Sequence, residues 1–322
     1  AGIKVLMVSS GAIGIGAKQL NIDKKITKTS LRQACAAIGQ PMLMHRYRLA
    51  FQQYDISIAQ VLITKELMDQ RATYNNLSTA VDTLLNLGVI PIFNENDCVS
   101  TAEIGPVFGD NDQLSAMIAS KLEAELLILL SDIDAFYDGN PKENMNAKPL
   151  SVISEITPEI INCAGGAGSS YSTGGMKSKI KAVEIAQMAG CETIITHGRI
   201  ERILPRIMKG EILGTLFLSK GKLKSRSRWI LNATPKGKIT VDNGAENALL
   251  KRKSLLPSGI ITIDGEFSKG DVVLINDQFK AIVGSSSADM QKMLGFHSKD
   301  CKNIFGSAKR DSIARSADIV KL

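Results

Sequence analysis

The chain has 322 residues, of which 44% are hydrophobic and 22% are charged, the composition of an ordinary globular protein. No hydrophobic run reaches the roughly 18–20 residues that a membrane-spanning helix needs, so we expect no membrane partner. The five cysteines are odd in number and lack CxxC spacing, which argues against a disulfide framework and a zinc site. We therefore expect a protein of the reducing cytoplasm.

The net charge of +7 is concentrated in the last third of the chain. Residues 1–218 contain 20 Lys and Arg against 22 Asp and Glu, whereas residues 219–322 contain 19 against 10. Such a basic module makes nucleic acid the first partner to consider. A solvated, lysine-rich surface is the simpler explanation of the same charge.

Five short apolar segments in the first two-thirds of the chain predict strands that are covered on both faces. They lie at residues 3–10, 56–64, 88–96, 124–132 and 191–198. Segments with helical periodicity separate them, at residues 30–54, 75–88, 111–122 and 174–190, and Pro41 is predicted to break or kink the first. This alternation predicts an α/β fold with a doubly wound, mostly parallel sheet.

The character of the chain changes after residue 219. The segment GKLKSRSR at 221–228 is basic and poor in apolar residues, which predicts a linker. Short strands separated by turn residues follow at 238–242, 259–265, 271–276 and 280–284. We therefore expect two domains, residues 1–220 and residues 221–322, the second of them a small β-barrel.

Polar side chains gather where the predicted strands end. Ser9 and Ser10 lead into a glycine-rich turn, NENDCVST follows at 94–101, GDND precedes a helix at 109–112, and SDID ends a strand at 131–134. Each cluster alone is also explained by a turn or a helix cap. Four such clusters at one edge of one sheet would be unfavourable without a ligand, and this edge is where α/β folds bind ligands.

The segment STGGMKSKI, residues 172–180, begins a predicted amphipathic helix. The first turn of a helix exposes unpaired N–H groups and a partial positive charge, both suited to phosphate. Gly174 and Gly175 let an anion approach the backbone, and Lys177 and Lys179 point to different faces. We favour a phosphate site over a flexible loop, although the segment is not a P-loop because no GxxxxGK[ST] pattern is present.

Several motifs, in chain order, resemble those of the glutamate 5-kinases, a branch of the amino acid kinase family. They are VSSGAIGIG (8–16), VIPIFNENDCVSTAEIG (89–105), FGDNDQLSA (108–116), LLILLSDIDAFYDGNP (126–141) and the segment 164–190 around TGGMKSK. The resemblance covers essentially the whole chain, including a C-terminal part similar to a PUA domain. It implies the amino acid kinase fold and transfer of the ATP γ-phosphoryl group to the side-chain carboxylate of L-glutamate, the first step of proline biosynthesis.

The resemblance also implies roles for individual residues. Ser10, Asp97 and Asn111 match glutamate contacts, with Asp97 suited to the α-ammonium group and Asn111 to carboxylate oxygens. Lys179 matches the lysine that neutralises charge on the transferred phosphoryl group, and Asp112 matches the aspartate that orients it. The implied nucleotide contacts are Ser131, Asp132, Thr173, Gly174, Gly175, Met176, Lys177, Ser178 and Lys179.

Further expectations follow from the same resemblance. Mg²⁺ is expected to come with ATP, held mostly by phosphates and water, so no dedicated metal site is predicted. Proline is the expected feedback inhibitor, and the protein is expected to form homo-oligomers. The family begins with a strand carrying a Lys-x-Gly-Ser/Thr motif, and this sequence starts after it, so we expect a truncated sequence.

Two alternatives remain open. A kinase of the same fold that acts on aspartate, N-acetylglutamate, carbamate or a nucleoside monophosphate would share many of these motifs, but Asp97 favours a substrate with a free ammonium group. The basic C-terminal third is also compatible with RNA binding. RNA is the less suitable partner because the phenylalanines of this part are scattered along it, at Phe267, Phe279, Phe296 and Phe305.

Overall fold

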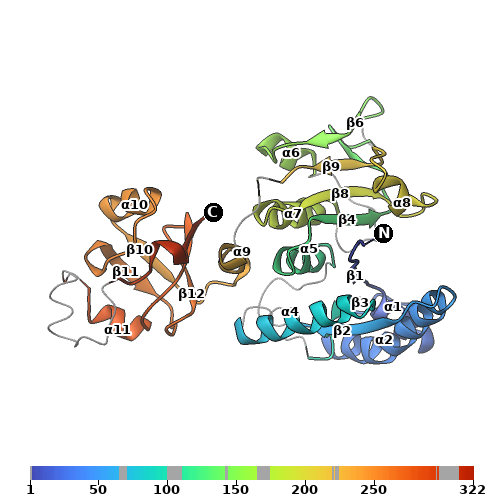
Figure 1. Cartoon of the computed structure of the whole chain (residues 1–322), viewed down its shortest axis with the longest axis horizontal. Helices are drawn as coiled ribbons and strands as arrows, with labels where there is room; N and C mark the ends of the chain where they lie inside the picture. Colours follow the sequence, from blue (N-terminus) through green and yellow to red (C-terminus); the bar gives the residue numbers. More distant parts are fainter. Residues whose placement is uncertain are drawn as a thin grey trace. The chain divides into compact units, whose positions relative to one another are not determined.

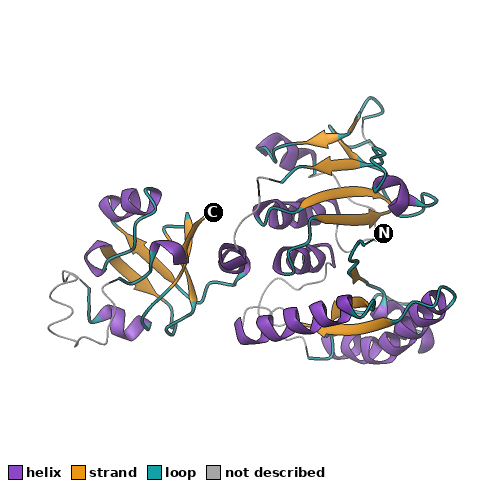
Figure 2. Cartoon of the chain, viewed as in Figure 1, coloured by secondary structure: helices purple, strands orange, loops and turns teal. Residues whose placement is uncertain are grey.

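The computed structural model describes residues 2–64, 71–99, 111–141, 144–164, 175–219, 221, 225–294, 296 and 312–322. The chain divides into two compact units, residues 1–221 and residues 222–322 (Figure 1). Strands and helices alternate in the first unit (Figure 2). No helix in the described part of the chain is long and apolar enough to span a membrane.

The described strands of the first unit form two main sheets. One is entirely parallel, in the order β1-β3-β2, with β1 at Met7–Val8, β2 at Ile58–Ile63 and β3 at Ile90–Glu95. The other has the order β4-β8-β9-β7, with β4 at Leu126–Ser131, β7 at Val152–Ile153, β8 at Glu192–His197 and β9 at Thr215–Phe217. Strand β9 is antiparallel to β8, and β5 (Phe136–Tyr137) pairs separately with β6 (Pro149–Leu150).

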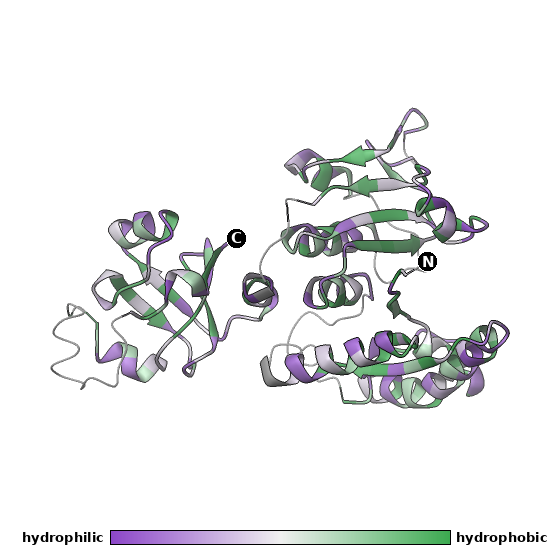
Figure 3. Cartoon of the chain, viewed as in Figure 1, coloured by the Kyte–Doolittle hydropathy of each residue, from purple (hydrophilic) through white to green (hydrophobic). Residues whose placement is uncertain are grey.

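The predicted α/β class is therefore confirmed, but the expectation of one continuous sheet is wrong for the described strands. The clusters after β1 and β3 belong to one sheet, and the cluster after β4 belongs to the other. Strands β2 and β4 are mostly hydrophobic (Figure 3), except for Gln60 within β2 and Ser131 at the end of β4.

Helix α5 joins the two sheets of the first unit. It contacts β1 and β3 of one sheet, β4 of the other, and helix α7. Every residue of α5 from Leu114 to Lys121 is buried, the polar Ser115, Ser120 and Lys121 included, so this helix lies in the interior of the unit. The helices in the described part of this unit are α1 (Ala12–Gln19), α2 (Thr29–Gln52), α4 (Arg71–Asn86), α5 (Asn111–Lys121), α6 (Pro158–Cys163), α7 (Gly175–Met188) and α8 (Ile203–Ile207).

Two predictions for α1 and α2 need correction. The predicted break at Pro41 does not occur: α2 continues through this residue, whose exposed position lets the lost N–H bond be tolerated without ending the helix. A kink at Pro41 stays a prediction. The glycine-rich segment after Ser10 is a turn only as far as Gly11, and from Ala12 it forms α1. Gly16 of this segment serves helix packing, because a Cβ atom on it would lie 1.8 Å from the Cys35 carbonyl oxygen of α2. A Cβ atom on Gly39 of α2 would likewise lie 1.8 Å from the Ala12 carbonyl oxygen of α1.

Gly39→Ala is expected to destabilise the protein by about 1–3 kcal/mol, because the added methyl group meets rigid backbone at the α1–α2 crossing. Gly14→Ala is the matched control, since Gly14 lies on α1 with no heavy atom within 4 Å of the added Cβ. That change should be neutral or stabilising by up to about 1 kcal/mol through helix propensity. Chemical denaturation of both variants checks the contrast, and equal stabilities would contradict the close crossing.

The second unit contains a five-stranded sheet in the order β11-β10-β12-β13-β14. Its hydrophobic core includes Ile239, Val273, Ile275 and Phe279. The described strands do not close into a ring, so the predicted barrel is not confirmed. The elements are β10 (Lys238–Val241), α10 (Asn243–Leu250), β11 (Ile260–Asp264), β12 (Val272–Ile275), β13 (Phe279–Ile282), α11 (Ser287–Gln291) and β14 (Ile319–Lys321).

The predicted linker is partly helical. Helix α9 spans Ser225–Asn232 and packs on β13 and β14 of the second unit. Arg226 forms an ion pair with Asp318, and the Lys280 Nζ atom donates to the carbonyl oxygens of Leu231 (2.6 Å) and Ala233 (2.9 Å). Lysine at the carbonyl end of a helix also complements the helix dipole, so partners distant in sequence stabilise a helix that local composition did not predict.

Candidate active site

Two neighbouring residues at the start of α5 bond to different elements. The Asn111 Nδ2 atom donates to the Ser9 carbonyl oxygen at 2.8 Å, just after β1. The Asp112 Oδ2 atom lies 2.7 Å from the Lys179 Nζ atom on α7. The first turn of α5 thus joins the turn after β1 to the first turns of α7.

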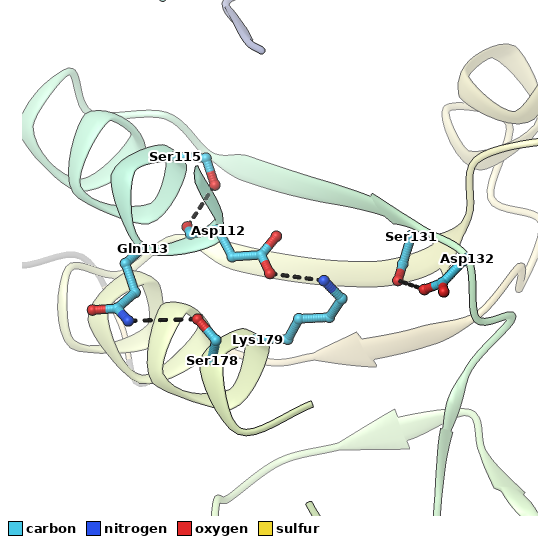
Figure 4. A network of polar contacts seen from close by, with 7 residues as sticks. All are labelled: Asp112, Gln113, Ser115, Ser131, Asp132, Ser178 and Lys179. Carbon is cyan, nitrogen blue, oxygen red and sulfur yellow. Dashed lines mark hydrogen bonds and ion pairs between the residues drawn. The ribbon is translucent and has the colours of Figure 1, made fainter. Parts of the chain in front are cut away.

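The ion pair between Lys179 and Asp112 is largely shielded from solvent. The two side chains are 14% and 18% exposed, and they point toward one another from α7 and α5 (Figure 4). A second contact joins the same helices, from the Gln113 Nε2 atom to the Ser178 Oγ atom at 3.4 Å. Asp112 therefore holds a cation at the amino end of α7, where a helix already favours an anion.

Ser9 is bonded to three elements. Its N–H donates to the Phe93 carbonyl oxygen of β3 at 2.9 Å, its own carbonyl accepts from Asn111 of α5, and its Oγ atom lies 2.8 Å from the Tyr47 Oη atom of α2. Ser9 is only 6% exposed. This places Ser10, the next residue and a predicted glutamate contact, beside Asn111, another predicted contact.

Asp97 lies just after β3, the strand that pairs with β1 in the same sheet. Burial raises the pKa of the Asp97 carboxyl above its ordinary value of 3.8, and the positive charge of Arg32 on α2 offsets part of that rise. The end of β3 before it is held by the Asn94 Nδ2 atom, which donates to the Gln40 Oε1 atom at 2.8 Å, with both residues buried. A half-buried carboxylate here is suited to a cationic group on a ligand.

The predicted nucleotide contacts lie at the carboxyl end of β4 and in the first turns of α7. The Ser131 Oγ atom donates to the Asp132 Oδ1 atom at 3.1 Å (Figure 4). Met176 packs on the hydrophobic core, Lys177 is exposed, and Ser178 and Lys179 face α5, so the two lysines point differently, as predicted. Thr173 and Gly174 lie outside the described residues. Among the described residues, no hydrogen bond or ion pair joins Ser131 or Asp132 to the first turns of α7.

Sequence reasoning missed the polar residues that support the site from α2. Arg32, Gln40 and Tyr47 lie on the helical face that also carries the buried Cys35 and Leu43. Polar side chains on an otherwise buried face usually have specific partners, and that pattern was a usable signal. Their partners lie 38 to 65 residues away, which no helical periodicity indicates.

Acidic, His and Cys side chains do not cluster as a metal site in the described ranges: no group of three or more could hold an ion there. Asp112 is already engaged by Lys179.

Comparisons with known proteins agree on the family. The model of the amino acid kinase family matches residues 1–197, and the model of the PUA domain matches residues 237–305. A glutamate 5-kinase of Methanosarcina mazei is 44% identical over 323 residues, covering 99% of this chain and 84% of that protein. Glutamate 5-kinases of Caldanaerobacter subterraneus subsp. tengcongensis and Geobacter sulfurreducens are each 40% identical, covering 100% of this chain and 88% of theirs.

These similarities extend across both units and include every segment that supplies a residue of the site. The described geometry and the motifs agree with them. The chain therefore belongs to the amino acid kinase family and, within it, to the glutamate 5-kinases.

Proposed function

We propose that this chain transfers the γ-phosphoryl group of ATP to the side-chain carboxylate of L-glutamate, as the names of its relatives indicate. A side-chain carboxylate oxygen attacks the γ-phosphorus, the bond to the bridging oxygen of ADP breaks, and ADP leaves. We assign this reaction to the first unit, within residues 1–220, and a separate PUA-like domain to residues 221–322.

The contacts of Asn111 and Asp112 are the observation that carries this proposal. One residue reaches Ser9, next to the proposed glutamate contact Ser10, and the other reaches Lys179, the proposed phosphate ligand. Two adjacent residues on one rigid helix therefore connect the acceptor side to the donor side. Phosphoryl transfer depends on such positioning and on cationic charge more than on a base, because the acceptor carboxylate is already ionised.

Each proposed residue has a distinct task. Asp97 pairs with the α-ammonium group of glutamate, and Ser10 and Asn111 orient its carboxylates. The Asn111 amide nitrogen has two protons, so its bond to Ser9 leaves one for substrate. Lys179 neutralises charge on the phosphoryl oxygens, and Asp112 fixes the direction of the lysine side chain.

Nucleotide binding is assigned to Ser131, Asp132 and the first turns of α7. The backbone N–H groups of Gly175, Met176 and Lys177 lie in those turns and are free of the usual intrahelical acceptors. Ser178 contributes by its contact to Gln113 of α5, which aligns the two helices. Thr173 and Gly174 complete the proposed set.

Mg²⁺ is proposed to accompany ATP and to neutralise phosphate charge when bound. Because Asp112 is paired with Lys179 and no three-ligand group occurs among the described side chains, phosphate oxygens and water are its best ligands. Proline is proposed as a feedback inhibitor and homo-oligomers as the assembled form. A cytoplasmic location is proposed from the requirement for ATP and from the four free cysteines of the described chain.

The direct test is ADP release by the full-length protein with glutamate, N-acetylglutamate, aspartate or UMP as acceptor. We expect glutamate to give the highest kcat/KM, because N-acetylglutamate has no ammonium group for Asp97. Higher kcat/KM with N-acetylglutamate or UMP would assign the chain to a different acceptor and overturn the proposal.

A further inference from the structure

We propose that Tyr47 of α2 is a positioning residue that sets the turn Ser9–Gly11 for glutamate. The inference rests on the proposed function and adds a residue that contacts neither substrate. It follows from the hydrogen bonds around Ser9, from the α1–α2 crossing and from the half-buried place of the tyrosine.

Counting protons gives the direction of these bonds. The Ser9 Oγ atom donates to the Ser10 carbonyl oxygen at 3.2 Å, which uses the single proton of the serine hydroxyl. The Tyr47 hydroxyl, 2.8 Å from the same Oγ atom, is therefore the donor in the second bond. The tyrosine holds the serine hydroxyl in the orientation that reaches Ser10.

The two hydrogen bonds from the Tyr47 hydroxyl through the Ser9 Oγ atom to the Ser10 carbonyl oxygen form a relay. This relay controls the peptide group between Ser10 and Gly11. A trans peptide is planar, so fixing the Ser10 carbonyl also fixes the Gly11 N–H, which points the opposite way. Gly11 has φ 100° and ψ 0°, a left-handed conformation that leads directly into α1. Without the relay, the Ser10–Gly11 peptide loses the side-chain contact that selects one orientation. Because Ser10 is a proposed glutamate contact, this loss should weaken glutamate binding.

The anchor of this relay is rigid. Gly39 lies two helical turns before Tyr47 and presses α2 against the backbone of α1, the helix that follows the turn. Gln40, beside Gly39, bonds to Asn94 in the segment that precedes Asp97. Helix α2 therefore holds both the turn after β1 and the end of β3 from the same face.

Tyr47→Phe in the full-length protein tests the inference, because it removes the hydroxyl and keeps the ring. Loss of one hydrogen bond should raise KM for glutamate by about 3- to 10-fold and leave KM for ATP within about twofold. Glutamate affinity measured by calorimetry should weaken by the same factor. Tyr54→Phe is the matched control, since that tyrosine is 75% exposed just after the same helix.

A double-mutant cycle distinguishes the relay from a general packing effect. If Tyr47 acts through the Ser9 hydroxyl, Ser9→Ala should weaken glutamate binding similarly, and adding Tyr47→Phe should weaken it little further. Ser9→Ala also keeps the test available if Tyr47→Phe does not fold. An unchanged KM for glutamate, or an equal rise in KM for ATP, would overturn the inference while leaving the proposed function intact. Absence of glutamate-dependent turnover in the unmodified protein would overturn both.

Discussion

Lys179→Ala is expected to lower kcat by roughly 10²–10³-fold, as when one preorganised charge-stabilising group is lost. The lysine is mostly shielded from solvent and is aimed by Asp112, so neither water nor a mobile neighbour replaces its charge. Glutamate-dependent ADP release measures the effect. The matched control is Lys181→Ala, an exposed lysine on the same helix, which should change kcat by less than about twofold.

The same substitution also leaves Asp112 without its cationic partner Lys179. A decrease in kcat caused by lower stability must therefore be separated from one caused by the missing catalytic charge. Removing one partner of a shielded ion pair is destabilising because the other charge stays desolvated. Adding Asp112→Asn to Lys179→Ala should therefore recover part of the lost Tm while kcat stays low. Activity of Lys179→Ala within threefold of the unmodified protein would exclude the proposed role.

Local sequence patterns were sufficient for the central elements of the first unit. Residues 88–96 and 111–122 were predicted as a strand and a helix, and the structure has β3 at Ile90–Glu95 and α5 at Asn111–Lys121. The strand is a continuous buried run, and the helix is buried from Leu114 to Lys121, so tertiary contacts and local preference agree. The first strand was predicted at residues 3–10, but only Met7–Val8 pairs in the structure, with β3.

Long-range contacts decided the features that were not predicted. The sequence of α9 resembles a linker because it is rich in charged and polar residues. The helix is stabilised by burial of Trp229 and Ile230 and by contacts of its ends with Lys280 and Asp318. Gly16 looks like a turn residue because α2, the helix whose backbone it meets at Cys35, begins more than ten residues later. Local composition carries no information about such partners.

The same distinction applies to the site. Patterns at strand ends and helix starts located the polar segments that contain Asp97, Asn111, Asp112 and Lys179, because backbone groups near such termini are open to ligands. The individual roles of these residues were implied by the family resemblance and stay predictions. The supporting residues Gln40 and Tyr47 lie in the middle of a long helix. Their role depends on which turn they touch, and only the fold supplies that.

Asp97→Asn is expected to lower kcat/KM for glutamate by about 10²-fold, because a neutral amide replaces the charged acceptor of the α-ammonium group. Asp82→Asn, the same chemical change at an exposed position of α4, is the matched control and should have little effect. The two variants are compared by initial rates at fixed, saturating ATP.

The raised pKa of Asp97 adds a pH dependence. Ammonium binding requires the ionised carboxylate, so kcat/KM for glutamate should fall as pH decreases through a pKa above 3.8. The side chain of glutamate itself titrates near about 4.3. The fall of kcat/KM at low pH therefore has two causes, and the part due to Asp97 should be absent from the pH profile of Asp97→Asn. If kcat/KM falls identically with decreasing pH in both proteins, the assignment of Asp97 is contradicted.

Ionisation of Asp97 should lower the stability of the folded protein, whereas it should strengthen glutamate binding. Between 3.8 and the raised pKa the folded state binds more protons than the unfolded state, so the free energy of unfolding falls as pH rises through this window. Above the window the buried charge is a persistent cost, which the neutral asparagine removes, and Tm of Asp97→Asn at pH 7 should exceed that of the unmodified protein. A variant that is more stable and yet binds glutamate poorly would show that this carboxylate is retained for substrate. A lower Tm together with unchanged glutamate affinity would instead make Asp97 a structural residue.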